Sequence, residues 1–297
     1  MKVLNYGSLN YDYVYAVDHM VLNGETLSST GMETHLGGKG LNQSVALAKA
    51  GAPVYHAGMV GEDGEQLLEA SRHYGINTDF ITRHQGRSGH AIIQLTPQGE
   101  NSILLYQGAN GKNSEEKIDT VLSGFAEGDI LLLQNEINLL NSIIEKAYDK
   151  HMKIVLNPSP LNETLLKCDL KKVSLFILNE IEGEQLTGES EPEKILKKLE
   201  TLYPASEVVL TLGKQGSMYA GKGEIYKGNC FSVPAIDTTA AGDTYTGYYL
   251  ASAMQGKCVE ECIRTASAAS AIAVTRKGAV PSIPEAEEVE AFLNKYK

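Results

Sequence analysis

The stretch Asp129-Ile130-Leu131-Leu132-Leu133-Gln134 is short and continuously apolar, which is typical of a strand buried on both faces of a parallel sheet. Further short apolar runs alternate with patterns of helical period along the chain that follows. The apolar runs cover 153–156, 175–178 and 208–212, and the helical patterns cover 140–147, 180–187 and 191–202. Because parallel strands are joined through helices that cover both faces of their sheet, this order predicts an α/β fold with a central, mainly parallel sheet.

Two segments do not follow this alternation. Residues 11–36 contain a run rich in Tyr and Val and then a polar stretch, and residues 88–107 read as a β-hairpin around the turn Pro97-Gln98-Gly99-Glu100. They are either surface hairpins or, together, a small sheet over the mouth of the main sheet, where enzyme lids are found. With no internal repeat and no low-complexity linker, we predict a single α/β domain over 1–297 with a discontinuous lid.

The composition limits the classes of partner. The chain has 297 residues, and 26 Lys and Arg against 37 Asp and Glu give a net charge of −11. This balance argues against nucleic acid or an anionic membrane as the main partner, because both require clustered Lys and Arg. Four cysteines do not make a disulfide framework, and no signal peptide or stretch of about 20 apolar residues is visible. We therefore expect a soluble, cytoplasmic protein with reduced thiols.

Polar residues and glycine follow the predicted strands. Glu136, Asn157, Asn179 and Gly213 each come just after the end of a strand. The carboxyl ends of parallel strands meet at one edge of the sheet, where open α/β folds bind their ligands. The stretch Thr211-Leu212-Gly213-Lys214-Gln215-Gly216 adds glycines that suit a nucleotide lying across that edge.

The stretch Leu36-Gly37-Gly38-Lys39-Gly40-Leu41-Asn42-Gln43 precedes a predicted helix that ends near Gly51. Its three glycines would let the backbone approach a ligand closely, with free N–H groups at the helix start. The alternative is a tight connection that uses glycine only for its conformational freedom. The sequence contains neither a Walker P-loop nor the GxGxxG fingerprint, which disfavours a dinucleotide-dependent oxidoreductase.

A second stretch, Ile236-Asp237-Thr238-Thr239-Ala240-Ala241-Gly242-Asp243-Thr244, opens a predicted helix that continues to Met254. Its run of small residues presents backbone amides, which favours an anion-binding site. Asp243 follows directly, and a carboxylate at this position could simply complement the helix dipole. Phosphoryl transfer requires both groups together, since amides stabilise charge on the phosphate and a carboxylate accepts the proton of the attacking hydroxyl.

At these two stretches the sequence resembles the ribokinase-like (phosphofructokinase-B) family of carbohydrate kinases. Residues 37–43 with 50–52 resemble the N-terminal signature of the family, and residues 237–244 resemble its C-terminal signature. The tail 273–282 and Gly108-Ala109-Asn110 resemble the ribokinase branch, and the similarity covers essentially the whole chain.

The resemblance implies a three-layer sandwich whose small lid sheet also forms the contact of a homodimer. It implies transfer of the ATP γ-phosphoryl group to a sugar hydroxyl, with ribose, giving ribose 5-phosphate, as the first candidate. Asp243 corresponds to the catalytic base, and Ala240, Ala241 and Gly242 correspond to the anion hole. The sugar-binding positions correspond to Asn10, Asp12, Gly38, Lys39, Gly40, Asn42, Glu136 and Asp243.

The resemblance also assigns nucleotide and metal positions. The nucleotide contacts correspond to Asn179, Thr211, Gly213, Gly216, Gly242 and Ser267. Glu182 matches the acidic residue of the family's NxxE element, which implies an indirect part in placing Mg²⁺. A loop for a monovalent cation, expected to be K⁺, corresponds to Asp237, Thr239, Ala273, Arg276, Gly278 and Ser282. Arg276 would take part through its carbonyl, because its guanidinium has the wrong charge for a cation ligand.

The chain departs from the family pattern at three positions. Ser267 stands where ribokinases often have His near the adenine, and His90 and Tyr106 are bulkier than the residues usual in the lid hairpin. His90 is either a structural hydrogen-bonding residue or, together with Tyr106, faces the sugar. A nucleoside kinase of the same family (adenosine, cytidine or pseudouridine) is therefore an alternative, since either ring could stack on a base. A catalytically silent sugar-binding regulator is another, and an intact Asp243 argues against it.

Overall fold

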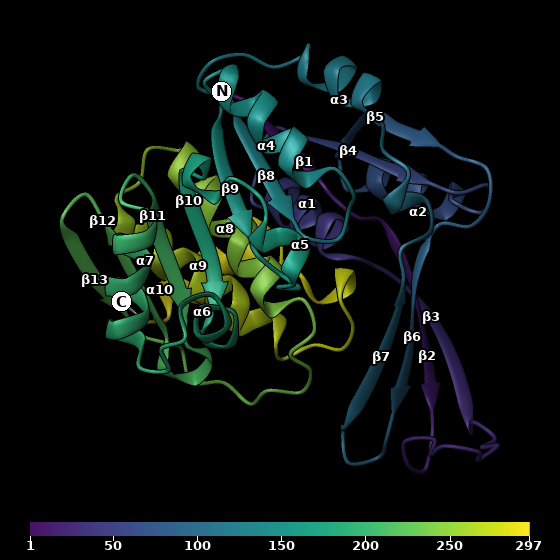
Figure 1. Cartoon of the computed structure of the whole chain (residues 1–297). Coiled ribbons are helices and arrows are strands. Elements are labelled where there is room, and N and C mark those ends of the chain that lie inside the picture. The colour runs from purple at the N-terminus through teal and green to yellow at the C-terminus, as the bar shows by residue number, and fades with distance from the viewer. Residues whose placement is uncertain (297) are drawn as a thin grey trace.

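The computed structural model describes residues 1–296 and has helices on both sides of a central sheet, from which a second sheet extends (Figure 1). The strands of the central sheet are β1 (Val3–Tyr6), β4 (Val54–Val60), β5 (Asn77–Arg83), β8 (Ile130–Gln134), β9 (Lys153–Asn157), β10 (Leu175–Asn179), β11 (Glu207–Thr211), β12 (Ser217–Gly221) and β13 (Glu224–Gly228). The strands of the second sheet are β2 (Asn10–Ala16), β3 (Gly31–Gly37), β6 (Gly89–Leu95) and β7 (Asn101–Tyr106). The α-helices are α1 (Lys39–Lys49), α2 (Glu65–His73), α3 (Glu115–Leu122), α4 (Leu140–Asp149), α5 (Glu163–Leu166), α6 (Glu180–Thr187), α7 (Pro192–Leu202), α8 (Ala241–Met254), α9 (Val259–Ala273) and α10 (Ala286–Asn294).

The central sheet confirms the predicted α/β fold. Within residues 1–296 its order is β13-β12-β11-β10-β9-β8-β1-β4-β5. Neighbouring strands from β11 to β5 are parallel, whereas β12 and β13 form an antiparallel edge. The strands predicted from the apolar runs agree with β8, β9, β10 and β11 to within one residue at either end. In the part of the chain that the structure describes, no helix is both long enough and apolar enough to cross a membrane.

The buried strands divide the apolar core into two layers because successive side chains point to opposite faces of a sheet. On β8, Leu132 packs with residues of α1, α8 and α9 on one face. Its neighbours Leu131 and Leu133 pack with residues of α3, α4 and α7 on the other face. This two-sided burial explains why the strand is continuously apolar in the sequence.

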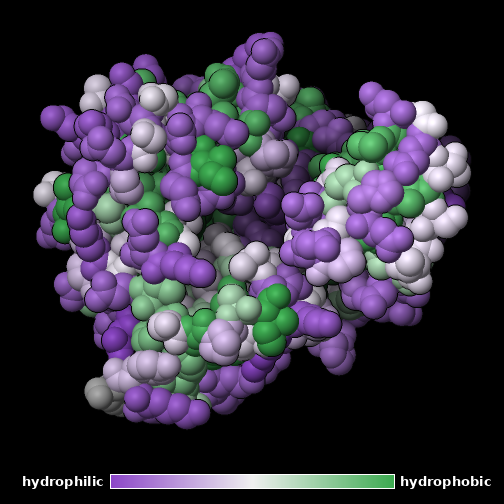
Figure 2. Space-filling view, turned by 90° about the horizontal axis from the view of Figure 1, so that it is seen from below, coloured by the Kyte–Doolittle hydropathy of each residue, from purple (hydrophilic) through white to green (hydrophobic). Residues whose placement is uncertain are grey.

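The second sheet is built from the two segments that depart from the alternation. Its order is β3-β2-β6-β7, in which two antiparallel hairpins meet through the parallel pair β2 and β6. It projects away from the body of the molecule (Figure 1). A view from below shows the surface hollowed between the body and this projecting lobe (Figure 2).

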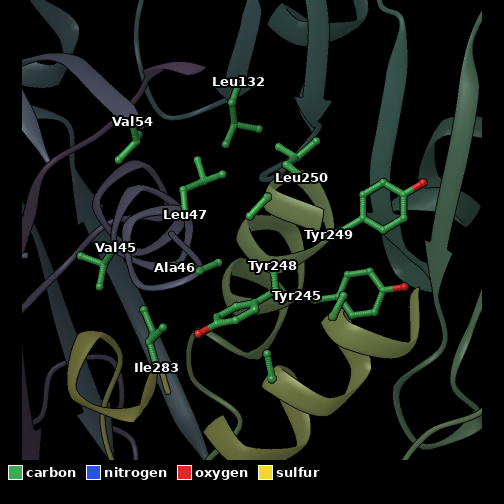
Figure 3. Close-up of a cluster of buried hydrophobic side chains, with 14 of the residues drawn as sticks. Val45, Ala46, Leu47, Val54, Leu132, Tyr245, Tyr248, Tyr249, Leu250 and Ile283 are labelled. Atoms are coloured by element: carbon green, nitrogen blue, oxygen red, sulfur yellow. The ribbon is translucent and has the colours of Figure 1, made fainter. Parts of the chain in front are cut away.

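Helices α1 and α8 cross in unusually close contact at Gly247. A Cβ atom at this position would lie 2.4 Å from the Cβ of Ala46 and 2.8 Å from the backbone nitrogen of Leu47. Apolar side chains of both helices surround the crossing (Figure 3). Gly38 and Ala240 immediately precede the two helices. The crossing therefore supports both glycine-containing stretches next to each other.

We expect Gly247→Ala to lower the free energy of unfolding by about 1–3 kcal/mol, because the added methyl group would overlap the backbone of α1. Urea unfolding followed by circular dichroism measures the change. Gly242→Ala in the same helix is the matched control, since no atom lies within 4 Å of a Cβ there and its stability should be unchanged. Equal stability of the two variants would show that the helices do not cross closely.

Candidate active site

A hollow of about 210 Å³ lies at the carboxyl ends of the parallel strands, beside the first turns of α6 and α8. Its lining combines residues from the glycine-rich stretches with residues at strand ends. The lining residues are Lys39, Asn157, Ile177, Leu178, Asn179, Glu182, Thr211, Thr238, Ala240, Ala241, Gly242, Asp243 and Thr246. This position agrees with the general location of ligand sites in open α/β sheets.

Asp243 lies in the first turn of α8 and is only 8% exposed. Two side-chain amides from α1 hold its carboxylate. Asn42 donates to Oδ2 at 3.0 Å, and Gln43 donates to Oδ1 at 2.8 Å. The Oδ1 atom of Asn42 is buried and has no hydrogen-bond partner. Since a buried polar atom is costly to leave unpaired, this oxygen is suited to accept a hydrogen bond from a ligand hydroxyl.

The start of α8 offers an open anion-binding surface. Ala240 adopts a left-handed conformation with φ 58°, and the carbonyl of Thr238 accepts the N–H of Ala241 at 3.2 Å. Among the described residues, no protein acceptor meets the N–H of Gly242 or Asp243. A Cβ at Gly242 would find no atom within 4 Å, so the space in front of these amides is open. Free helix-terminal amides with open space in front of them suit a phosphate group.

At the start of α1, three of the backbone amides in the first glycine-rich stretch are not free, contrary to the expectation from its sequence. The N–H groups of Lys39, Gly40 and Leu41 are all used within the protein. They donate to the carboxylate of Glu136 at 3.0 Å, to Oγ of Ser8 at 3.2 Å and to the Ser8 carbonyl at 2.9 Å, respectively. A Cβ at Gly40 would lie 2.3 Å from the Ser8 backbone nitrogen. This glycine is therefore required by a tight connection, the alternative that the sequence left open.

The carboxylates of Asp12, Glu136 and Asp243 and the ammonium group of Lys39 form one interacting cluster. Burial raises the pKa of Asp12 to about 7, with further contributions from Glu136 and Asp243, while His35 opposes the shift. Burial also raises the pKa of Glu136, although Lys39 and its hydrogen bonds oppose this. Burial lowers the pKa of Lys39, but the carboxylates around it outweigh this effect and raise the pKa overall. Lys39 therefore stays protonated among carboxylates.

The remaining sugar-binding positions of the sequence analysis lie beside this cluster. Oδ1 of Asn10 accepts a hydrogen bond from the side chain of Asn110 at 2.7 Å. Gly38 has φ 91°, and a Cβ there would lie 3.0 Å from Oγ of Ser8. Oγ of Ser8 also hydrogen-bonds the carboxylate of Glu136. These contacts hold the side chain of Asn10 against Asn110 and that of Glu136 against Ser8.

The strand register of the second sheet places His90 and Tyr106 on the face opposite Asp12. His90 pairs with Tyr11 and with Tyr106, whereas Asp12 pairs with Ala91. Because side chains alternate along a strand, His90 and Tyr106 share the face of Tyr11. The ring centroids of His90 and Tyr106 are 4.9 Å apart. The two rings therefore pack against each other on the face opposite Asp12, which favours the structural alternative for His90.

By the same register, three other residues share the face of Asp12. They are Ala91 and its partner Leu105 in the hairpin of β6 and β7, and His35 on β3. The sequence analysis did not single out any of them. Only the pairing of β2 with β3 and β6 identifies these residues as neighbours of Asp12. That pairing joins segments far apart in the sequence, so it could not be predicted from the sequence.

The nucleotide position Asn179 and the Mg²⁺ position Glu182 form a structural motif together. Oδ1 of Asn179 accepts the N–H of Glu182 at 2.9 Å, and Oε2 of Glu182 accepts the N–H of Asn179 at 3.1 Å. This reciprocal pair is a capping box that begins α6. Thr211 also lines the hollow, whereas Gly213, Gly216 and Ser267 do not. Ser267 is buried in α9.

The residues assigned to a cation loop are joined by hydrogen bonds. Oδ1 of Asp237 accepts the N–H and the hydroxyl of Thr239, and Oδ2 accepts the N–H of Gly278 at 2.8 Å. The guanidinium of Arg276 pairs with Glu288 at 2.5 Å. That pairing leaves only the backbone of Arg276 for a role near Asp237. Ala273 accepts the N–H of Arg276 at 3.0 Å, and Ser282 donates to the Ala279 carbonyl at 2.7 Å.

Several residues of the site were not assigned from the sequence. Gln43 holds Asp243, and Thr238 and Thr246 line the hollow. Gln43 belongs to the first glycine-rich stretch and Thr238 to the second stretch. Their positions in these stretches could therefore have identified them as residues of the site. Ser8 lies two residues after the end of β1 and carries no comparable signal in the sequence.

The comparisons with known proteins agree with this geometry. Residues 1–286 match the family described as "pfkB family carbohydrate kinase". The chain belongs to the pfkB family. Among its relatives, ribokinase of Haemophilus influenzae is 38% identical over 301 residues, which cover 97% of this chain and 96% of that protein. Ribokinase of Bacillus subtilis is 32% identical over 296 residues, which cover 97% and 98%.

Solved structures show the same pfkB fold. Ribokinase of Thermotoga maritima aligns with a TM-score of 0.86 and 33% identity, covering 99% of each chain. Ribokinase of Arabidopsis thaliana, complexed with ribose and ATP, aligns with a TM-score of 0.86 and 30% identity, covering 98% of each chain. The family and fold predicted from the two signatures are therefore confirmed, and the chain is a carbohydrate kinase of the ribokinase type.

The raised pKa of Asp12 predicts how the stability of this pfkB protein depends on pH. Between pH 4 and 7 the folded protein holds a proton that the unfolded chain has lost, so rising pH lowers the free energy of unfolding. We expect Asp12→Asn to remove this loss and to stabilise the protein at pH 8 by about 1–3 kcal/mol, with little effect at pH 4. Urea unfolding of both proteins at pH 4 and pH 8 measures this difference in the free energy of unfolding. An equal stabilisation at the two pH values would show that Asp12 is ionised at both.

Proposed function

We propose that this pfkB-family kinase transfers the γ-phosphoryl group of ATP to the primary hydroxyl of ribose, with Asp243 as the general base. One observation carries the proposal. The buried carboxylate of Asp243 is held by two amides directly beside the open N–H groups at the start of α8. A proton acceptor and an anion site are thus adjacent, as the transfer of a phosphoryl group to a hydroxyl requires.

In the proposed reaction, the hydroxyl oxygen of the sugar attacks the γ-phosphorus. A new oxygen–phosphorus bond forms as the bond between that phosphorus and the β,γ-bridging oxygen breaks, and ADP leaves with the electron pair. The hydroxyl proton passes to Asp243. The amides of Ala240, Ala241 and Gly242 were assigned to the developing charge, and the open amides of Gly242 and Asp243 are the best placed for it. The ammonium of Lys39 lines the same hollow and adds positive charge.

The Mg²⁺ assignment concerns the carboxylate of Glu182. Glu182 uses one carboxylate oxygen for its capping box and leaves the other available toward the hollow. No group of three metal-ligating side chains is found within residues 1–296. Mg²⁺ would therefore be held mainly by phosphate oxygens and water, with Glu182 contributing indirectly, and it would neutralise phosphate charge when bound.

A monovalent cation fits the loop that Asp237 organises. The second lone pair of Asp237 Oδ2 and the backbone carbonyls of Ala273 and Arg276 supply the oxygen atoms that K⁺ prefers. Gly278, Thr239 and Ser282 complete the proposed loop. When bound, K⁺ would order the backbone that leads into α8. The loop is tied to α9 through the N–H of Asp237, which donates to the carbonyl of Val274 at 3.2 Å.

Ribose is favoured over a nucleoside by the second sheet. The two rings that could have stacked on a base, His90 and Tyr106, lie on the face away from Asp12. Small and aliphatic residues, Ala91 and Leu105, occupy the face of Asp12 instead. Relatives with 32–38% identity over the full length are named ribokinase, which supports the same choice.

An ADP-release screen over pentoses, hexoses and nucleosides, with and without K⁺, tests the proposal. We expect the highest kcat/KM with ribose and a lower rate without K⁺. In the same assay, Asp243→Asn should lower kcat for ribose by about 10²- to 10⁴-fold, because the hydroxyl loses its proton acceptor. Strong activity on a nucleoside and none on ribose would contradict the assignment of ribose as the substrate. An unchanged kcat for Asp243→Asn would contradict the assignment of Asp243 as the general base.

We further propose that the second sheet is the lid and forms a homodimer contact, and that the enzyme works in the cytoplasm. The whole of β7 is exposed, including Ile103, Leu104 and Tyr106. An exposed edge strand that carries large apolar residues is typically covered by a partner. The four cysteines within the described part of the chain are unpaired, which agrees with a reducing compartment.

Leu104→Asp should convert the dimer into a monomer in analytical ultracentrifugation, because it places a charge in the apolar contact. Ile225→Asp on β13 is the matched control, since Ile225 and Leu104 are both 69% exposed. We expect the control to remain dimeric. A wild-type monomer, or an equal loss of dimer in both variants, would contradict the lid contact.

A further inference from the structure

We propose that Asn5 and Gln134 are positioning residues that orient the carboxylate of Asp243 through Gln43. These three side chains, Asn5, Gln134 and Gln43, are called the amide relay below. Neither Asn5 nor Gln134 lines the hollow. The inference rests on the proposed role of Asp243 as the base, and it extends that role to two residues that touch no reacting atom.

The amide relay is continuous and fully buried. Nε2 of Gln43 donates to Oδ1 of Asp243 at 2.8 Å, and Oε1 of Gln43 accepts from Nε2 of Gln134 at 2.6 Å. The same nitrogen of Gln134 donates to Oδ1 of Asn5 at 2.9 Å. Asn5, Gln134 and Gln43 are all inaccessible to solvent. Side chains from β1, β8 and α1 thus connect the central sheet to the base on α8.

A backbone carbonyl fixes the direction of every hydrogen bond in the relay. Nδ2 of Asn5 donates to the carbonyl of Gly40 at 2.7 Å, and a backbone carbonyl can only accept. The oxygen of Asn5 must therefore face Gln134, which turns the NH₂ group of Gln134 toward Asn5 and Gln43. The oxygen of Gln43 is then committed to Gln134, and its NH₂ group is left to donate to Asp243.

The far end of the network supports the same direction. Nδ2 of Asn5 also donates to Oγ of Ser44 at 2.8 Å, and Oγ of Ser44 lies 2.8 Å from Nδ1 of His56. Nε2 of His56 faces the carbonyl of Gly7 at 3.3 Å, so Nε2 carries the proton. Burial lowers the pKa of His56 to about 4, so the ring is neutral at physiological pH. The network therefore holds one hydrogen-bond pattern and does not move a proton.

Gln134 is a costly residue at its position. It ends β8, whose other residues from Ile130 to Leu133 are all apolar. Its Oε1 atom is buried without a hydrogen-bond partner, and a Cβ at Gly7 would lie 2.3 Å from that atom. A leucine or methionine would avoid this unpaired oxygen. A local cost of this kind, next to a catalytic group, indicates that the amide serves the site.

Without Gln134 the oxygen of Gln43 would lose its partner. Apart from Asp243 itself, only the long hydrogen bond from Gln43 to Oδ1 of Asn157, at 3.3 Å, would then hold this amide. The amide of Gln43 could therefore rotate and present its oxygen to the carboxylate of Asp243, which would repel it. Asp243 would keep only the hydrogen bond from Asn42 and could turn away from the attacking hydroxyl. Small displacements of this kind lower the rate of the chemical step by up to about 100-fold, and they do not require a loss of substrate binding.

The test is Gln134→Met, which keeps the length of the side chain and removes its hydrogen bonds. We expect kcat for ribose to fall about 10- to 100-fold while KM for ribose and for ATP changes less than about threefold. Gln43→Met should lower kcat at least as much. The double variant Gln43→Met/Gln134→Met should match Gln43→Met alone, because Gln134 acts through Gln43. Asn5→Ala, which only removes atoms, should lower kcat in the same direction.

The controls separate positioning from stability. Ser71→Ala removes a buried hydroxyl that donates to Leu67 at 2.7 Å in α2, outside the site, and should lower the free energy of unfolding without changing kcat. The inference is overturned if Gln134→Met and Asn5→Ala keep wild-type kcat, or if the effects of Gln43→Met and Gln134→Met add. Asp243→Asn is assayed alongside. If Asp243→Asn also turned over normally, the proposed base itself would be wrong, which is a different failure.

Discussion

The close crossing of α1 and α8 is the contact on which the site depends. Gly247 and Ala46 let the two helix backbones approach without intervening side chains. The helices begin at the two glycine-containing stretches, so their crossing places Asn42 and Gln43 against Asp243. These residues are about 200 positions apart in the sequence, and no local interaction joins them. The proposed catalytic group is thus assembled by packing in the core, and its geometry is only as accurate as that packing.

The two stretches use glycine for different physical reasons. Around Gly40 the backbone is pressed against Ser8, and the N–H groups of Lys39, Gly40 and Leu41 have protein acceptors. Around Gly242 the space is open, and the N–H groups of Gly242 and Asp243 have no acceptor among the described residues. One stretch therefore carries side chains to the site, and the other presents its backbone. This division also explains how a chain of net charge −11 can bind a polyanion, since dipoles and one local ammonium supply the favourable field.

The sequence was sufficient for the fold and for the position of Asp243, because both follow from local patterns. The buried strands have apolar runs, and Asp243 follows small residues at a helix start. It was insufficient where a contact joins distant segments. Whether the N–H groups near Gly40 are free depends on two acceptors that are distant in the sequence. Ser8 is 32 residues from Gly40, and Glu136 is 97 residues from Lys39. Likewise, alternation gives β6 two faces, but only its pairing with β2 shows which face His90 occupies.

The second sheet is anchored to the body at one end only. At the start of β2, Asn10 bonds to Asn110, and the hydroxyl of Tyr11 donates to the carbonyl of Asp63 at 2.6 Å. Farther along, β2 becomes exposed and ends at Ala16. Each residue adds about 3.3 Å along a strand, so a small rotation about the anchored end displaces the tip several times farther than it displaces Asp12. If a ligand bound near Asp12 rotated the sheet slightly, the largest displacement would therefore be at the tip, far from the proposed site.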